Sequence, residues 1–143
     1  MGPSRNRDRS QVSRVACIGA GTVGRAWAVV FARAGYDVAL FDSLPGQVVD
    51  HALPGARRTL AMLAEGGLLT EPVDAVMARL HVSTSIAEAV TGAAYVQESV
   101  REDVDVKRQV FAEIAAAAPA DAILASSTSA IPGSDFLGAI ANP

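Results

Sequence analysis

The chain has few aromatic side chains and only one cysteine. Phenylalanine, tryptophan and tyrosine make up 5% of its 143 residues, and Cys17 is the single cysteine. One cysteine forms no internal disulfide, and its place inside an apolar run predicts a buried, small hydrophobic residue. The net charge is −3, so the chain lacks the excess of positive charge that favours nucleic-acid or membrane-surface partners. We therefore expect neither a nucleic-acid partner nor a membrane partner.

Long uninterrupted apolar runs are also lacking. No stretch is long enough to cross a bilayer, although half of the residues are hydrophobic. Residues 1–11 are polar and lack the apolar core of a signal peptide. We expect a cytoplasmic protein with a disordered leader over residues 1–13 and one domain over residues 14–143.

The most informative motif is a glycine-rich turn between two apolar segments. The run from Val15 to Ile18 leads directly into Gly19-Ala20-Gly21-Thr22-Val23-Gly24. A second apolar run ends at Asp42, 18 residues past Gly24. This pattern is typical of a strand, a tight turn, a helix and a second strand that together bind a dinucleotide.

Each position of the turn has its own predicted role. Gly19 permits the tight turn out of the strand, Gly21 leaves room for a pyrophosphate, and Gly24 lets the helix approach the strand. The backbone N–H groups of Thr22 and Val23 would point at the phosphates, at the positive end of the helix dipole. The turn is therefore predicted to hold the diphosphate.

Asp42 is placed to accept hydrogen bonds from the two ribose hydroxyls. A carboxylate there repels a 2′-phosphate, and Ser43 rather than an arginine follows it, so NAD is favoured over NADP. One alternative is a structural glycine turn in another α/β protein. A second alternative is a methyltransferase, whose glycine turn usually follows an acidic residue. This chain has Cys17 and Ile18 there, which argues against a methyltransferase.

The rest of the chain alternates between helices and strands. Six apolar positions after the turn share one face of a helix that Gly35 ends: Val23, Ala26, Trp27, Val30, Phe31 and Ala34. Further helices are predicted over residues 44–65, with a kink or break at Pro54-Gly55, and over residues 71–78 and 104–118. Further strands are predicted over residues 37–42, 80–83, 94–98 and 122–126. The fold class is α/β, a Rossmann-type doubly wound parallel sheet in a single domain, ordered 3-2-1-4-5.

Three segments carry a family resemblance. Residues 15–28 (VACIGAGTVGRAWA), 96–103 (VQESVRED) and 123–129 (ILASSTS) resemble the NAD-binding domain of 3-hydroxyacyl-CoA dehydrogenases. The Gly-Arg-Ala-Trp-Ala stretch, and Ser127 where that family usually carries asparagine, are similar to its λ-crystallin and L-gulonate 3-dehydrogenase branch. The resemblance implies NAD as the cofactor, no metal, and oxidation of a secondary 3-hydroxyl group to a ketone.

The resemblance also implies roles at matched positions. Glu102 and Lys107 would line the cofactor groove beyond the fourth strand. The hydroxyl of Ser129 would contact the 3-hydroxyl or 3-keto oxygen of the substrate. Read without the resemblance, the two charges are solvated side chains near a helix start, and the serine belongs to a helix cap.

The acid–base pair of the family is not matched in this sequence. The family's base is a histidine that follows the serine motif, whereas the histidines here are His51 and His81, before the fourth strand. We therefore expect these residues to form the NAD-binding domain alone, without the C-terminal helical domain. This domain is expected to bind NADH with little or no turnover. The substrate would be a small molecule, either a 3-hydroxyacyl-CoA or a hydroxy acid such as L-gulonate. The alternative is a non-catalytic dinucleotide-binding module. We expect a homodimer for the full-length enzyme and self-association for the 143 residues.

Overall fold

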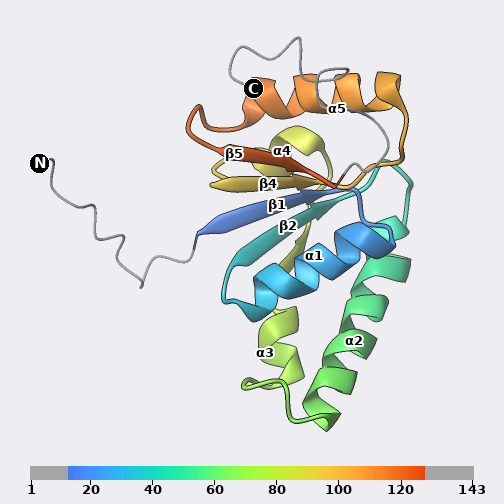
Figure 1. Cartoon of the computed structure of the whole chain (residues 1–143), viewed down its shortest axis with the longest axis vertical. Coiled ribbons are helices and arrows are strands. Elements are labelled where there is room, and N and C mark those ends of the chain that lie inside the picture. Colours follow the sequence, from blue (N-terminus) through green and yellow to red (C-terminus); the bar gives the residue numbers. More distant parts are fainter. Residues whose placement is uncertain (1–12, 128–143) are drawn as a thin grey trace, which may run out of the picture.

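A computed structural model describes residues 13–127, and in this part of the chain one parallel sheet forms the centre of the molecule (Figure 1). Its strands are β1 (Arg14–Ile18), β2 (Asp37–Phe41), β3 (Leu80–Val82), β4 (Tyr95–Glu98) and β5 (Ile123–Ser126). All four neighbouring pairs are parallel, in the order β3-β2-β1-β4-β5. The predicted doubly wound sheet and its strand order are confirmed. Of the expected leader, residues 1–12 lie outside the described residues, as does Ser129.

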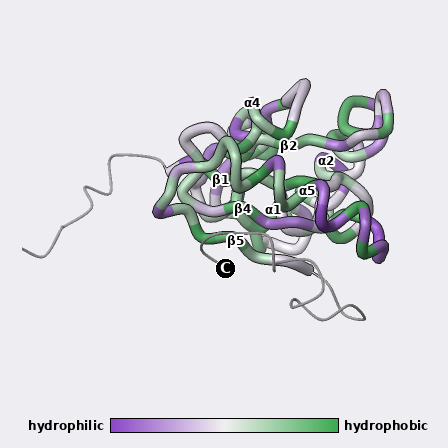
Figure 2. The backbone as a smooth tube through the Cα atoms, turned by 90° about the horizontal axis from the view of Figure 1, so that it is seen from above, coloured by the Kyte–Doolittle hydropathy of each residue, from purple (hydrophilic) through white to green (hydrophobic). Residues whose placement is uncertain are grey.

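Helices cover both faces of the sheet (Figure 1). One layer holds α1 (Thr22–Arg33), the π-helix η1 (Gln47–Ala52), α2 (Leu53–Glu65) and α3 (Val73–Met77). The other layer holds α4 (Ile86–Val90) and α5 (Val104–Ala117). Successive strand residues alternate between the two layers, as strand geometry requires, so Cys17 packs in the first core and Ala16 and Ile18 in the second. Hydropathy along the tube varies within each helix, as expected for helices that bury one side (Figure 2).

Helix α1 forms as predicted, but its buried face is not the predicted apolar stripe. The buried residues are Gly24, Ala28, Val29 and Ala32. Val23 is 53% exposed, Trp27 37% and Val30 54%. Small residues four positions apart bring the helix backbone close to the strands, and the larger apolar side chains then face outward.

A kinked helix or two helices were predicted after β2, and the structure has two helices there. The π-helix η1 passes into α2 at Leu53, and Pro54 sits in the first turn of α2, where a missing N–H costs nothing. The chain leaves α2 through Gly66 and Gly67, as predicted.

Helix α4 was not predicted, although a local signal for it exists. Ser85 caps the helix by accepting a hydrogen bond from the N–H of Glu88 at 3.0 Å. Ser85-Ile86-Ala87-Glu88 is thus the serine and glutamate spacing of a capping box. The helix has only five residues, too few for a recognisable apolar period.

Candidate functional site

A groove of about 780 Å³ follows the carboxyl edge of the sheet. Its walls come from the glycine turn, the end of β2, the start of α4, the β4–α5 loop and α5. Open α/β sheets bind ligands at this edge, between two adjacent strands whose following connections run to opposite faces of the sheet. Here that point lies between β1 and β4, the strands that carry Gly19 and Ser99 at their ends.

The three glycines of the turn differ in what surrounds them. Gly19 has a φ of +99°, and a Cβ added there would lie 2.7 Å from the carbonyl of Ser99. A Cβ on Gly24 would lie 1.8 Å from the carbonyl oxygen of Gly19. A Cβ on Gly21 would meet nothing within 4 Å. The structure thus has the tight turn predicted at Gly19 and the close approach of the helix predicted at Gly24, while Gly21 borders open space in the groove.

The start of α1 can accept an anion. Gly21 is the N-cap, so no side chain caps the helix, and the first turn contains no acidic residue. The first N–H groups of a helix, which include those of Thr22 and Val23, have no partner within the helix. They lie at the positive end of the helix dipole and line the groove.

The carboxylate of Asp42 lies beside the glycine turn. Its Oδ2 accepts a hydrogen bond from the N–H of Ala20 at 2.8 Å, and its Oδ1 accepts one from the N–H of Leu44 at 2.9 Å. Each carboxylate oxygen can accept more than one hydrogen bond, so both can also accept from ribose hydroxyls. The site residues Gly21, Thr22, Val23 and Asp42 therefore line one side of the same groove.

Lys107 is placed differently from the sequence-based expectation. Its side chain is fully buried, and its Nζ donates to both carboxylate oxygens of Glu98 at 2.9 Å. The same carboxylate accepts hydrogen bonds from the N–H of Val100 at 2.7 Å and from the hydroxyl of Ser126 at 2.6 Å. The lysine is therefore neither a solvated charge nor part of the open lining. It is the buried partner of Glu98, whose carboxylate links β4 to β5 through Ser126 and to the β4–α5 loop through Val100.

Glu98 is the residue of this cluster that sequence reasoning missed. A charged residue at the end of an apolar strand run is an available signal, because buried charges need a partner. The partner, Lys107, is nine positions away on the next helix, so a local sequence pattern does not predict the pair. Glu102 is exposed in the β4–α5 loop, one residue after Arg101, which lines the groove.

The two histidines lie away from the groove. His51 is exposed on η1. His81 is exposed on β3, with its Nε2 3.4 Å from a carboxylate oxygen of Asp37. Neither lines the groove, so neither is placed to act on a ligand there.

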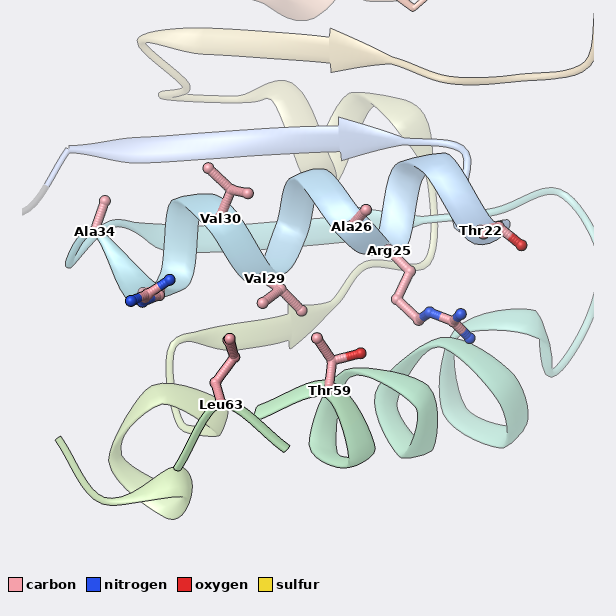
Figure 3. Close-up of a pocket in the computed structure, with 9 residues that line it drawn as sticks. Thr22, Arg25, Ala26, Val29, Val30, Ala34, Thr59 and Leu63 are labelled. Atoms are coloured by element: carbon pink, nitrogen blue, oxygen red, sulfur yellow. The ribbon is translucent and has the colours of Figure 1, made fainter. Parts of the chain in front are cut away.

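A second hollow, of about 600 Å³, lies between α1 and α2 (Figure 3). Val29 points from α1 toward Thr59 and Leu63 of α2, and Arg25 reaches toward the start of α2. None of the three glycines of the turn lines this hollow, but Thr22 lines both the hollow and the groove.

Two kinds of feature are absent from the described part of the chain. Across residues 13–127, no helix combines the length and apolar character that crossing a membrane requires. Over the same residues, no three or more histidine, cysteine, aspartate or glutamate side chains are grouped so that they could hold a metal ion.

Comparison with known proteins gives one consistent result. Residues 14–143 match the sequence profile described as 3-hydroxyacyl-CoA dehydrogenase, NAD binding domain. L-carnitine dehydrogenase of Mesorhizobium japonicum is 41% identical over 129 residues, which cover 89% of this chain and 34% of that protein. The lambda-crystallin homolog of Bos taurus is 38% identical, over 90% of this chain and 40% of that protein.

Solved structures show the same likeness. The crystal structure of 3-hydroxybutyryl-CoA dehydrogenase from Escherichia coli K12 aligns with a TM-score of 0.84 and 32% identity. The alignment covers 93% of this chain and 28% of that one. The chain thus spans between about a quarter and two fifths of the length of these three similar proteins.

Proposed function

The chain belongs to the 3-hydroxyacyl-CoA dehydrogenase family, of which it carries the NAD-binding domain, and we propose that NAD binds in the groove at the carboxyl edge of the sheet. The adenosine ribose lies on Asp42 and the pyrophosphate lies over Gly21, against the N–H groups of Thr22 and Val23. One observation carries this proposal: the side of Gly21 where a Cβ would point is open for 4 Å, between an uncapped helix start and a carboxylate.

The proposed site fits an anion next to a sugar. The helix start supplies N–H donors and a positive dipole end, which suit a diphosphate. Asp42 supplies an acceptor for two neighbouring hydroxyls and disfavours a 2′-phosphate. On the other side of the groove, Ile86, Val106 and Val110 supply apolar walls, which suit the flat base of an adenosine.

The test is a matched pair of glycine substitutions. Gly21→Ala adds a methyl group that meets no protein atom, and φ at this position is −73°, which alanine adopts freely. We expect this variant to keep the unfolding temperature of the wild type and to lose NADH affinity, measured by isothermal titration calorimetry. The added methyl group occupies the space assigned to the pyrophosphate.

Gly24→Ala is the control for this pair. Its added methyl group would collide with the carbonyl of Gly19, so it must push α1 away from β1. We expect this variant to unfold at a lower temperature, with a cost of about 1–3 kcal/mol. Unchanged NADH affinity in a folded Gly21→Ala variant would remove the pyrophosphate from this position.

The reaction that we propose for the whole protein is oxidation of a secondary hydroxyl group to a ketone. Bound NAD supplies a hydride acceptor for this chemistry. Glu102, exposed in the β4–α5 loop, is proposed to line the cofactor groove beyond β4, and the buried Lys107 is proposed to support this part of the site through Glu98 without lining it. Ser129, which lies outside the described residues, is proposed to contact the substrate oxygen. A homodimer of the full-length enzyme and a cytoplasmic location are further parts of this proposal.

Within this reaction class, a free 3-hydroxy acid is favoured over an acyl-CoA. The supporting observation is that two L-carnitine dehydrogenases are 41% and 38% identical to this chain, against 32% for the hydroxybutyryl-CoA enzyme. NADH formation by the full-length protein from L-carnitine, L-gulonate and 3-hydroxybutyryl-CoA separates the two classes. Activity on the acyl-CoA with none on the free acids would reverse the choice.

A further inference from the structure

A second polar network crosses the end of β4, on the face opposite the pair formed by Glu98 and Lys107. The hydroxyl of Tyr95 donates to Oε1 of Gln97 at 2.9 Å, and Nε2 of Gln97 donates to Oγ of Ser127 at 2.8 Å. Oγ of Ser127 lies 2.8 Å from Oγ of Ser99. Gln97 is 3% exposed, so the network starts in the protein interior and ends at Ser99, which lines the groove.

The hydrogen bonds of this network allow an arrangement in which the last hydroxyl, that of Ser99, is a donor to the groove. Gln97 donates to Ser127, so the hydroxyl proton of Ser127 is available to donate to Ser99. When Ser127 is the donor of this pair, Ser99 accepts and its own proton can be donated into the groove. Donors and acceptors arranged in a chain polarise one another, which strengthens the final donor. In this arrangement the network presents one O–H donor at the groove.

The order of the strands places this group relative to a dinucleotide. Asp42 follows β2, Gly19 follows β1, Ser99 follows β4 and Ser127 follows β5, and these strands are neighbours in that order. Neighbouring strands are about 4.8 Å apart. With the adenosine ribose on Asp42 and the pyrophosphate at the turn after β1, the remaining half of the dinucleotide extends over the ends of β4 and β5.

We propose that Ser99 donates a hydrogen bond to the nicotinamide riboside half of NAD, and that Gln97 and Ser127 are positioning residues for this bond. The proposal rests on the proposed function, because it uses the placement of the adenosine ribose and the pyrophosphate. Val23 borders the same part of the groove and is exposed, so it offers an apolar contact beside this hydroxyl.

Three ligands test the proposal on the 143-residue chain. ADP carries the adenosine and both phosphates, ADP-ribose adds the second ribose, and NADH adds the nicotinamide. We expect Ser99→Ala to lower NADH affinity about fivefold, the loss of one hydrogen bond, and to leave ADP affinity within about twofold. The ADP-ribose titration then shows whether the ribose or the nicotinamide accepts the bond. Each affinity is measured by calorimetry.

Two further variants separate positioning from folding. Gln97→Met keeps the length of the side chain but removes the donor to Ser127, and we expect the same selective loss for NADH. A purely structural role of Gln97 would lower ADP and NADH affinity by the same factor. Ser43→Ala is the matched control, because Ser43 lines the adenosine side of the groove, and it should leave the ratio of the two affinities unchanged.

The possible outcomes distinguish the two proposals. Selective loss of NADH affinity in Ser99→Ala supports the inference. Equal loss for ADP and NADH, or no loss for either, overturns it while the proposed function stands. A folded wild-type chain that binds none of the three ligands overturns the proposed function, and this inference falls with it.

Discussion

At the scale of single residues, the carboxylate of Asp42 has two tasks. Its oxygens hold the N–H groups of Ala20 and Leu44, and they are also the proposed acceptors for the ribose. We expect Asp42→Ala to weaken NADH binding by about 1–3 kcal/mol, because a buried ribose hydroxyl loses its acceptor. Calorimetry with NADH measures the change.

Asp42→Asn is the control that keeps the size of the side chain and one acceptor oxygen. We expect an intermediate loss of NADH affinity and a smaller preference for NADH over NADPH, because the charge that repels a 2′-phosphate is gone. If Asp42→Ala bound NADH as tightly as the wild type, the ribose would lie elsewhere.

Residue-scale prediction from the sequence succeeded where the signal is local. The spacing of Gly19, Gly21, Gly24 and Asp42 identifies the turn, because these residues act through backbone geometry that the chain order fixes. The buried pair of Glu98 and Lys107 and the network from Tyr95 to Ser99 depend on contacts between strands and between layers. Such contacts follow from the sheet register, which a linear pattern does not contain.

At the scale of elements, Arg79 ties the end of α1 to the segment before α3. Its guanidinium donates to the carbonyl oxygen of Ala32 at 2.8 Å and to both carboxylate oxygens of Glu71. The hydrogen bond from Arg79 holds the pKa of Glu71 below its ordinary value of 4.5. A carboxyl group with a lowered pKa in the folded state stabilises that state above the unfolded pKa, and loses this effect as the pH falls through the folded pKa.

This linkage predicts a pH-dependent effect of Glu71→Gln. At pH 7 the variant should be less stable than the wild type in urea unfolding, because it lacks the charged acceptor for Arg79. The difference should shrink once the pH falls below about 4.5 and vanish below the folded pKa. A difference of the same size at pH 7 and at pH 3 would show that the carboxylate charge does not contribute. Asp74→Asn is a suitable control, since its partner Arg57 is exposed and is not part of this contact.

For α1, the sequence predicted the helix correctly but its buried face wrongly. The apolar period of Val23, Trp27 and Val30 identified a helix correctly, but the three side chains are exposed. The buried face instead presents Gly24, Ala28 and Ala32, because close packing on the strands selects small side chains. Hydropathy alone ranks these residues below the larger ones, so the pattern defines the helix but not its orientation.

At the scale of the whole molecule, Cys17 reports on cooperative unfolding. It lies in β1, between β2 and β4, and has no exposed surface. Burial raises the pKa of its thiol to about 12. The thiolate is the reactive form, so a disulfide reagent should reach Cys17 only when the centre of the sheet opens.

NADH should therefore protect Cys17 although it binds at the edge of the sheet. A ligand that binds only the folded state, at 100 times its dissociation constant, lowers the unfolded population about 100-fold, which is about 2.7 kcal/mol. Where opening and closing are faster than the reaction, labelling by the reagent follows this population, so it should slow by the same factor. The Gly21→Ala variant should label at the wild-type rate and gain no protection from NADH. If NADH bound the wild type but left its labelling rate unchanged, β1 would open locally with the groove intact, and the sheet would not unfold as one unit with its binding edge.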